Sequence, residues 1–348
     1  MKTWDAIVVG GGIIGLSLAR ELHKKQLRVL VLDRGQPGHE ASHAAAGMLA
    51  DSGEIPSAMR RFATSSANLY PEFVREIQDE SDTNIDLRAQ GTIIFFDPDD
   101  TAECDGEILS HHQVAELEPA LAPSAREACL RNERSIDPRA LTSALWKAAK
   151  RREIDISSGA EVVEVLIAAG KAVGVRTTKT SYSAPTVINC AGAWSGAIPP
   201  LHFPIRPVKG QMLCMIGGPV LQHVVRSPDV YLVPRSDGRV MIGSTLEDAG
   251  FDKRTDIDTI QRLQHRAIRL MPCLGEARIH ESWAGLRPAT PDALPLMGET
   301  EAKGYFLATG HFRDGILLAP ATARVMAQLT TGAVPEIEIE AFSPSRYS

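Results

Sequence analysis

No stretch of the 348-residue sequence comes near the 18 or more consecutive apolar residues of a membrane-spanning helix. The first residues also lack the pattern of a secretory signal peptide, because Met1–Asp5 leads directly into the short apolar run 6–9. We therefore expect a cytoplasmic protein without an integral membrane span.

Positive charge is not in excess, since 37 Lys and Arg stand against 43 Asp and Glu, for a net charge of −6. A protein that binds nucleic acid mainly through its phosphates needs a basic surface, so we expect no nucleic-acid partner. Cysteine is scarce and scattered, and no two cysteines have Cys-x-x-Cys spacing: Cys104, Cys129, Cys190, Cys214 and Cys273. This excludes a disulfide framework or a cysteine zinc site and fits a reducing compartment. The length allows two or three domains.

The N-terminal segment carries a dinucleotide-binding pattern. The apolar run 5–9 is followed by Gly10-Gly11-Gly12-Ile13-Ile14-Gly15, a helical pattern over 13–25, and a second apolar run that ends at Asp33. Gly10 permits the tight turn, Gly12 lets the backbone approach a pyrophosphate, and Gly15 lets the helix pack closely on the sheet. The helix N-terminus offers N–H groups to phosphates. Asp33 is suited to accept from ribose hydroxyls, and an acid there favours FAD or NAD over NADP.

A second motif, His39-Glu40-Ala41-Ser42-His43, has the H-E-x-x-H spacing of a zinc site. Pro37-Gly38 breaks any helix that leads into it, and the small apolar run 44–49 follows. We therefore expect a loop that touches the dinucleotide, and no metal site.

The rest of the chain alternates between segments that predict both helices and strands and segments that predict short strands only. A helix is predicted after Asp137-Pro138, with strand-like runs at 161–167, 172–176 and 186–190, and a strand–loop–helix unit covers 305–329. Residues 85–132 and 203–284 instead contain short strand-like runs separated by turns, such as 93–96, 212–216, 230–233 and 240–242. These two segments predict an antiparallel sheet assembled from two insertions.

Several pieces together resemble the D-amino-acid oxidase family of flavoproteins, in particular its glycine oxidase (ThiO) type. They occur in family order over nearly the whole chain: Val8–Gly15, Ala44–Leu49, Cys190–Ser195, Pro207–Gln211, Tyr231–Arg235, Trp283–Pro288 and Gly310–Thr322. The resemblance implies an α/β fold with a Rossmann-like FAD-binding domain and an inserted antiparallel-sheet substrate-binding domain. The domains would comprise 1–84, 133–202 and 285–348 for FAD, and 85–132 and 203–284 for the substrate.

The resemblance also implies an activity. The family oxidises an amine at the carbon next to a carboxylate, and O2 reoxidises the flavin to give H2O2. Glycine oxidases act on glycine, sarcosine and small D-amino acids, and the imine can serve thiamine thiazole synthesis. FAD would be non-covalent, since no cysteine lies in 274–348. A homo-oligomer, tetramer or dimer, is expected.

The resemblance also implies which residues form the site, because each matches a family position in these pieces. Arg287 matches the arginine that binds the substrate carboxylate, Tyr231 the tyrosine that assists it, and Arg313 an arginine beside the active site; Ala50 would border the pocket. The expected FAD contacts are Gly10, Gly12, Ile13, Ile14, Gly15, Asp33, Arg34, Ala41, Ser42, Ala46, Gly47, Met48, Val162, Gly192, His311, Phe312, Arg313, Asp314, Gly315, Ile316 and Leu317. His311 is expected to pack at the flavin rather than act as a base.

Other functions stay open at this point. A quinone-linked D-amino-acid dehydrogenase, or an oxidase of a bulkier N-substituted amino acid, would share these residues and differ in electron acceptor or substrate. A flavoprotein that modifies tRNA is disfavoured by the charge balance. A non-catalytic flavin-binding module is disfavoured by the presence of Arg287, Tyr231 and Arg313 together.

Overall fold

A six-stranded sheet holds the N-terminal strand at its centre in the computed structural model, which describes residues 3–51, 55–97, 105–218 and 220–347. The strand order is β19-β20-β13-β1-β2-β9, and every pair is parallel except the antiparallel pair β19–β20. The strands are β1 (Ala6–Val9), β2 (Val29–Asp33), β9 (Asp155–Ser158), β13 (Thr186–Asn189), β19 (Leu296–Glu299) and β20 (Tyr305–Thr309).

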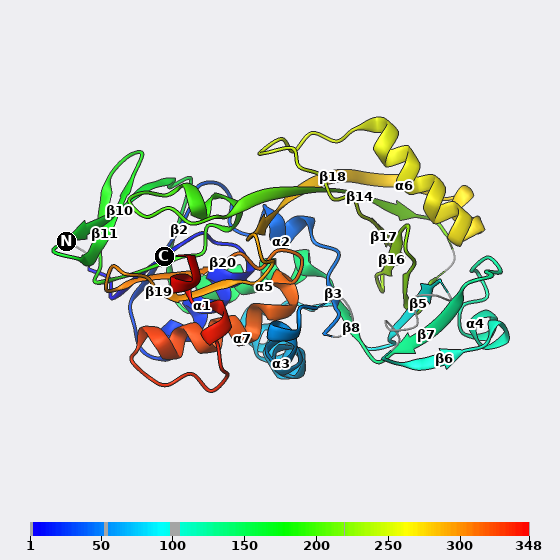
Figure 1. Ribbon diagram of the computed structural model, residues 1–348, viewed down its shortest axis with the longest axis horizontal. Coiled ribbons are helices and arrows are strands. Elements are labelled where there is room, and N and C mark those ends of the chain that lie inside the picture. Colours follow the sequence, from blue (N-terminus) through cyan, green and yellow to red (C-terminus); the bar gives the residue numbers. More distant parts are fainter. Residues whose placement is uncertain (1–2, 52–54, 98–104, 219, 348) are drawn as a thin grey trace.

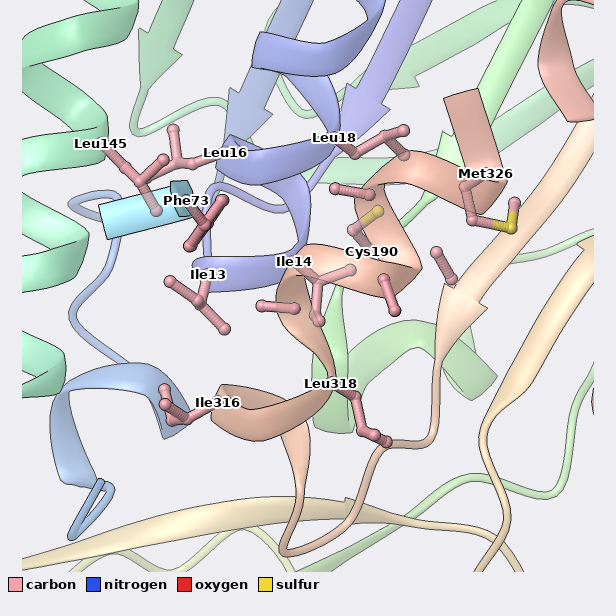
Figure 2. Packing of buried hydrophobic residues seen from close by; sticks show 14 of the residues in the cluster. Ile13, Ile14, Leu16, Leu18, Phe73, Leu145, Cys190, Ile316, Leu318 and Met326 are labelled. Carbon is pink, nitrogen blue, oxygen red and sulfur yellow. The ribbon is translucent and has the colours of Figure 1, made fainter. Parts of the chain in front are cut away.

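Both faces of this sheet are covered, as its continuous apolar strands require. Val8 and Val31 belong to a core cluster with the helices, whereas Ile7 and Leu30 belong to a cluster on the opposite face, because successive side chains of a strand alternate. The helices of the first cluster are α1 (Ile13–Lys24), α3 (Ser57–Ser81), α5 (Pro138–Arg151) and α7 (Gly315–Thr330). Figure 2 shows side chains of α1 and α7 packed in this cluster.

The opposite face carries a small antiparallel sheet of β10 (Val162–Ala168), β11 (Lys171–Thr177) and β12 (Ser181–Ser183). The predicted runs 161–167 and 172–176 are therefore strands, but they form a sheet of their own, outside the six-stranded one. Cluster members such as Val165 and Val175 bury the inner face of this small sheet against the large one.

The second large sheet has the order β18-β14-β17-β16-β15-β5-β7-β6 and lies at the other end of the molecule (Figure 1). Its strands are β5 (Thr92–Phe96), β6 (Glu107–Leu109), β7 (Glu127–Arg131), β14 (Arg206–Ile216), β15 (Val224–Arg226), β16 (Tyr231–Pro234), β17 (Val240–Gly243) and β18 (Arg278–Ala289). All its pairs are antiparallel except β15–β5, which joins the two chain segments in parallel. The helix α6 (Ile257–Leu270) packs on one face.

Smaller elements join these parts. A three-stranded antiparallel sheet of β3 (Met48–Leu49), β8 (Arg134–Ile136) and β4 (Leu87–Arg88) lies between the two large sheets (Figure 1). The remaining elements are α2 (Ala41–Ala44), α4 (His111–Leu117) and the 3₁₀ turns η2 (Gly192–Ala197), η3 (Pro272–Gly275), η4 (Glu340–Phe342) and η5 (Pro344–Tyr347).

The predicted fold class, a Rossmann-like domain with an inserted and mainly antiparallel sheet, is confirmed. The domain boundaries stay a prediction, and β18 crosses the one expected between residues 284 and 285. Cys190, Cys214 and Cys273 are free thiols, and Cys104 lies outside the described residues. In the part of the chain that the structure describes, no helix is long and apolar enough to cross a membrane.

Candidate active site

A cavity of about 720 Å³ lies between the two large sheets and is lined by residues from both. Its volume is within the range of dedicated ligand sites, about 300–1,000 Å³. The wall contains Arg287, Tyr231, Arg313 and Ala50 together with the expected FAD contacts, except Gly15 and Leu317. The structure thus brings together residues that are up to about 300 positions apart in the sequence.

The glycine-rich loop forms one end of the cavity, and its glycines are required by close backbone approaches. Gly10 has φ +102°, and a Cβ there would lie 2.4 Å from the carbonyl oxygen of Cys190. A Cβ at Gly15 would lie 1.9 Å from the carbonyl oxygen of Gly10. Gly15 therefore acts by packing the first turn of α1 against the loop, which explains why it does not itself line the cavity.

Two polar side chains accept hydrogen bonds from the backbone of this loop and of the first turn of α1. The Ile13 N–H, in the first turn of α1, donates to Ser42 Oγ at 2.9 Å. The Gly11 N–H donates to Asp33 Oδ2 at 2.7 Å, and the Gly35 N–H donates to Asp33 Oδ1 at 2.8 Å. Asp33 thus braces the turn at the carboxyl end of β2, where the ribose of a dinucleotide lies in this fold. The glycine cradle and the helix N-terminus fit FAD.

The loop after β20 forms another part of the wall and leads into α7. The Phe312 N–H donates to the carbonyl oxygen of Pro288 at 2.9 Å, and Phe312 has φ +45°, in the left-handed region. The following residues Asp314, Gly315 and Ile316 bring the N-terminus of α7 to the cavity. Leu317 does not reach it, because its side chain is buried in the helical core at 1% exposure.

His311 is a buried residue of this loop, and its Nε2 lies 3.1 Å from Thr322 Oγ1. Burial lowers the pKa of His311 to about 3, so the ring is neutral at ordinary pH. A neutral imidazole with so low a pKa is a poor proton acceptor. This agrees with a packing role for His311.

Arg287 lies in the part of the cavity wall that the second large sheet forms. It lies on β18 opposite β14, and a Cβ at Gly210 would fall 2.1 Å from Arg287 Nη1, so the missing side chain of Gly210 provides the space for the guanidinium. Arg287 Nη2 donates to Ser244 Oγ at 2.8 Å and Nη1 donates to the carbonyl oxygen of Thr245 at 3.2 Å.

Burial and neighbouring groups shift the pKa of Arg287. Burial lowers the pKa of the guanidinium, and the positive charge of Arg313 lowers it further, whereas Tyr231 and Glu247 raise it. Arginine stays protonated at working pH despite such shifts, so the site presents a fixed cation. The fork geometry of a guanidinium suits bidentate binding of a carboxylate.

Tyr231 lies beside this group on β16. A Cβ at Gly243 would lie 2.6 Å from Tyr231 Oη, so the ring covers the glycine on the neighbouring strand β17. Arg287 and Tyr231 are predicted site residues, whereas Gly210, Gly243, Ser244 and Thr245 were not predicted to take part. The signal for Gly210 was present in the piece Pro207–Gln211, whereas Ser244 and Thr245 carried no pattern of their own.

The H-E-x-x-H motif forms no zinc site in the described residues. The helix α2 begins only at Ala41, the rings of His39 and His43 stack with centroids 5.0 Å apart, and Glu40 pairs with Lys253. Within residues 3–51, 55–97, 105–218 and 220–347, no group of three or more His, Cys, Asp or Glu is placed to hold a metal ion. Glu40, Ala41 and Ser42 instead line the cavity.

A dinucleotide-binding loop and a partly buried arginine thus line one cavity. The chain belongs to the DAO family of FAD-dependent oxidoreductases, which it matches over residues 5–329. It is 31% identical to the glycine oxidase of Pseudomonas putida over 98% of both chains. The crystal structure of glycine oxidase from Geobacillus kaustophilus has a TM-score of 0.94 and 31% identity over 99% of both chains.

A further relative is the bifunctional protein ThiO/ThiG of Synechocystis, which is 36% identical over 99% of this chain. The match covers only 54% of that protein, so the chain spans about half the length of the bifunctional relatives it matches. L-Proline dehydrogenase from P. horikoshii, at 21% identity and a TM-score of 0.88, shares the fold.

Proposed function

We propose that the protein oxidises glycine and closely related small amines that carry a carboxylate, including sarcosine and small D-amino acids, with FAD as the electron acceptor. The observation that carries this proposal is the placement of Arg287. Its guanidinium lies over Gly210 in the wall of the same cavity that the glycine-rich loop enters. Relatives named glycine oxidase, at 31–32% identity, support the choice of substrate.

The side chains divide the work of binding and orientation. Arg287 binds the substrate carboxylate through its fork, held in place by Ser244 and Thr245. Tyr231 assists at the same carboxylate, and Arg313 adds positive charge at the cavity wall. Fixing the carboxylate orients the substrate so that Cα is the reacting carbon, and this orientation contributes to the rate enhancement.

Bound FAD would supply the redox chemistry by taking a hydride from Cα and passing the electrons to O2, which gives H2O2. The loop 10–15 and Asp33 would hold its pyrophosphate and ribose. At the other end, the N–H groups that begin α7 would stabilise negative charge. The absence of cysteine from 274–348 supports non-covalent binding, so denaturation should release free FAD.

Anaerobic mixing with a panel of amines tests the proposal. Glycine, sarcosine and small D-amino acids should bleach the flavin absorbance, and amines without a carboxylate should not. Oxygen uptake with H2O2 release distinguishes an oxidase from a quinone-linked dehydrogenase. Bleaching only by larger N-substituted glycines would replace the proposed substrate by the bulkier alternative.

We further propose that the imine product supplies thiamine thiazole synthesis, with the ThiO/ThiG relatives as support. The free thiols of Cys190, Cys214 and Cys273 support a cytoplasmic location. A homo-oligomer, dimer or tetramer, remains part of the proposal, and sedimentation equilibrium of the purified protein tests it.

A further inference from the structure

The residues between β17 and α6, 244–256, connect the two ends of the cavity, and we call them the crossing segment. At its start, Ser244 and Thr245 hold Arg287. Further along, the ring of Phe251 stacks on the ring of Trp194, with centroids 5.4 Å apart and an interplanar angle of 27°. Lys253 Nζ lies 2.9 Å from Glu40 Oε2. The crossing segment thus begins at the end of β17 in the second large sheet and contacts residues that follow β13 and β2 of the six-stranded sheet.

Both partners of these contacts belong to the cavity wall. Trp194 and Glu40 line it, as does Leu246 of the crossing segment itself. The Cζ of Arg34 lies 4.3 Å from the centroid of the Trp194 ring. Arg34 directly follows Asp33, and this end of β2 is where a dinucleotide places its adenosine ribose. The contacts of Phe251 and Lys253 therefore lie at the adenosine end of the cavity.

The side chain of Phe251 does not contribute to the hydrophobic core of the second large sheet. Its side chain remains 50% exposed and belongs to none of the hydrophobic clusters of the described residues. A large apolar side chain held half in water, against a tryptophan of the other part of the molecule, makes a contact that can open without unfolding either sheet. The ion pair of Lys253 and Glu40 is exposed as well and is weak by itself.

We propose that Phe251 and Lys253, with Trp194 and Glu40, form a clasp across the cavity that retains FAD and whose opening allows FAD to leave. This inference rests on the proposed function, since it takes FAD as the occupant of the cavity. Closing the clasp fixes Trp194 beside Arg34 at the adenosine end. Because the crossing segment also carries Ser244 and Thr245, the same segment serves cofactor retention and the position of Arg287.

The rate of FAD release from the diluted holoenzyme tests the clasp, with protein and free FAD separated at intervals. Phe251→Ala should accelerate release about fivefold, the loss of one aromatic pair. Phe251→Trp keeps a stacking ring and should release FAD near the wild-type rate. Lys253→Met should accelerate release about twofold, and added salt should accelerate release in the wild type but not in this variant.

Two matched substitutions control for unspecific effects. Ile257→Ala removes an apolar side chain that is 69% exposed at the start of α6. Lys179→Met removes an exposed lysine that is distant in sequence from the crossing segment. Both should release FAD at the wild-type rate. A Phe251→Ala/Lys253→Met protein that releases FAD at the wild-type rate, or controls that accelerate release equally, would overturn the clasp. A wild type that binds FAD but oxidises no amine refutes the proposed function instead, and its FAD release still decides about the clasp.

Discussion

Replacing Arg287 by alanine removes the guanidinium that occupies the space beside Gly210, and we expect it to abolish most turnover while FAD stays bound. In the structure both terminal nitrogens of the guanidinium have a partner in residues 244–245, so the fork is oriented before any substrate arrives. A hydrogen bond to a charged group contributes about 1.5–3 kcal/mol. Loss of a bidentate pair, about 3–6 kcal/mol, therefore lowers kcat/KM for glycine by about 10²- to 10⁴-fold.

Two further variants sharpen this measurement. Arg287→Lys keeps the positive charge but loses the planar fork, so its kcat/KM should lie between those of the wild type and Arg287→Ala. Arg278→Ala changes an exposed arginine at the opposite end of β18 and should leave kcat/KM unchanged. The assay is H2O2 release over a range of glycine concentrations, with flavin content measured for each protein. Wild-type kcat/KM in a flavin-replete Arg287→Ala protein would refute the assignment of the carboxylate to Arg287.

Three other predictions follow from named contacts. Gly210→Ala would place a Cβ 2.1 Å from Arg287 Nη1, so the guanidinium must move and kcat/KM for glycine should fall at least about tenfold, with flavin content retained; unchanged kinetics would contradict the packing argument. His311 is buried in its neutral form with a pKa of about 3. Below about pH 6.5 the unfolded state therefore binds a proton at this side chain that the folded state does not bind. His311 should for this reason lower the free energy of unfolding by about 2 kcal/mol between pH 7 and pH 5. Urea unfolding of His311→Gln at both pH values should lack this contribution, and an equal loss in both proteins would exclude it. Ala50→Phe should change the ratio of kcat/KM for glycine and sarcosine severalfold, since overpacking costs about 1–3 kcal/mol, whereas an unchanged ratio in flavin-replete protein would remove Ala50 from the pocket.

The glycine-rich loop is the part of the site that could be predicted from the sequence in detail. The expected helix 13–25 is α1 at Ile13–Lys24, and the expected turn at Gly10 has a positive φ. These features are local, since strand, turn and helix are specified by a few neighbouring residues. The role of Gly15 was likewise readable, although its effect is to pack the helix rather than to line the cavity.

The second sheet was predicted only in outline. Strand-like runs at 93–96, 212–216 and 240–242 are strands, but β14 begins six residues earlier than expected, and β15 carried no recognised signal. The parallel pairing of β15 with β5 was also unforeseen, because a local pattern contains no information on which distant strand becomes the neighbour.

The sequence by itself determined the local elements and the candidate residues: a dinucleotide loop with its acid, and arginines in pieces typical of one flavoprotein family. Only the tertiary structure decided how they meet. The register of β14 against β18 places Gly210 beside the guanidinium of Arg287, and residues 244–245 supply its hydrogen-bond partners. The crossing segment brings Phe251 to Trp194, 57 positions earlier in the chain. Such contacts depend on strand register and on packing between distant segments, and neither is encoded within a short stretch of sequence.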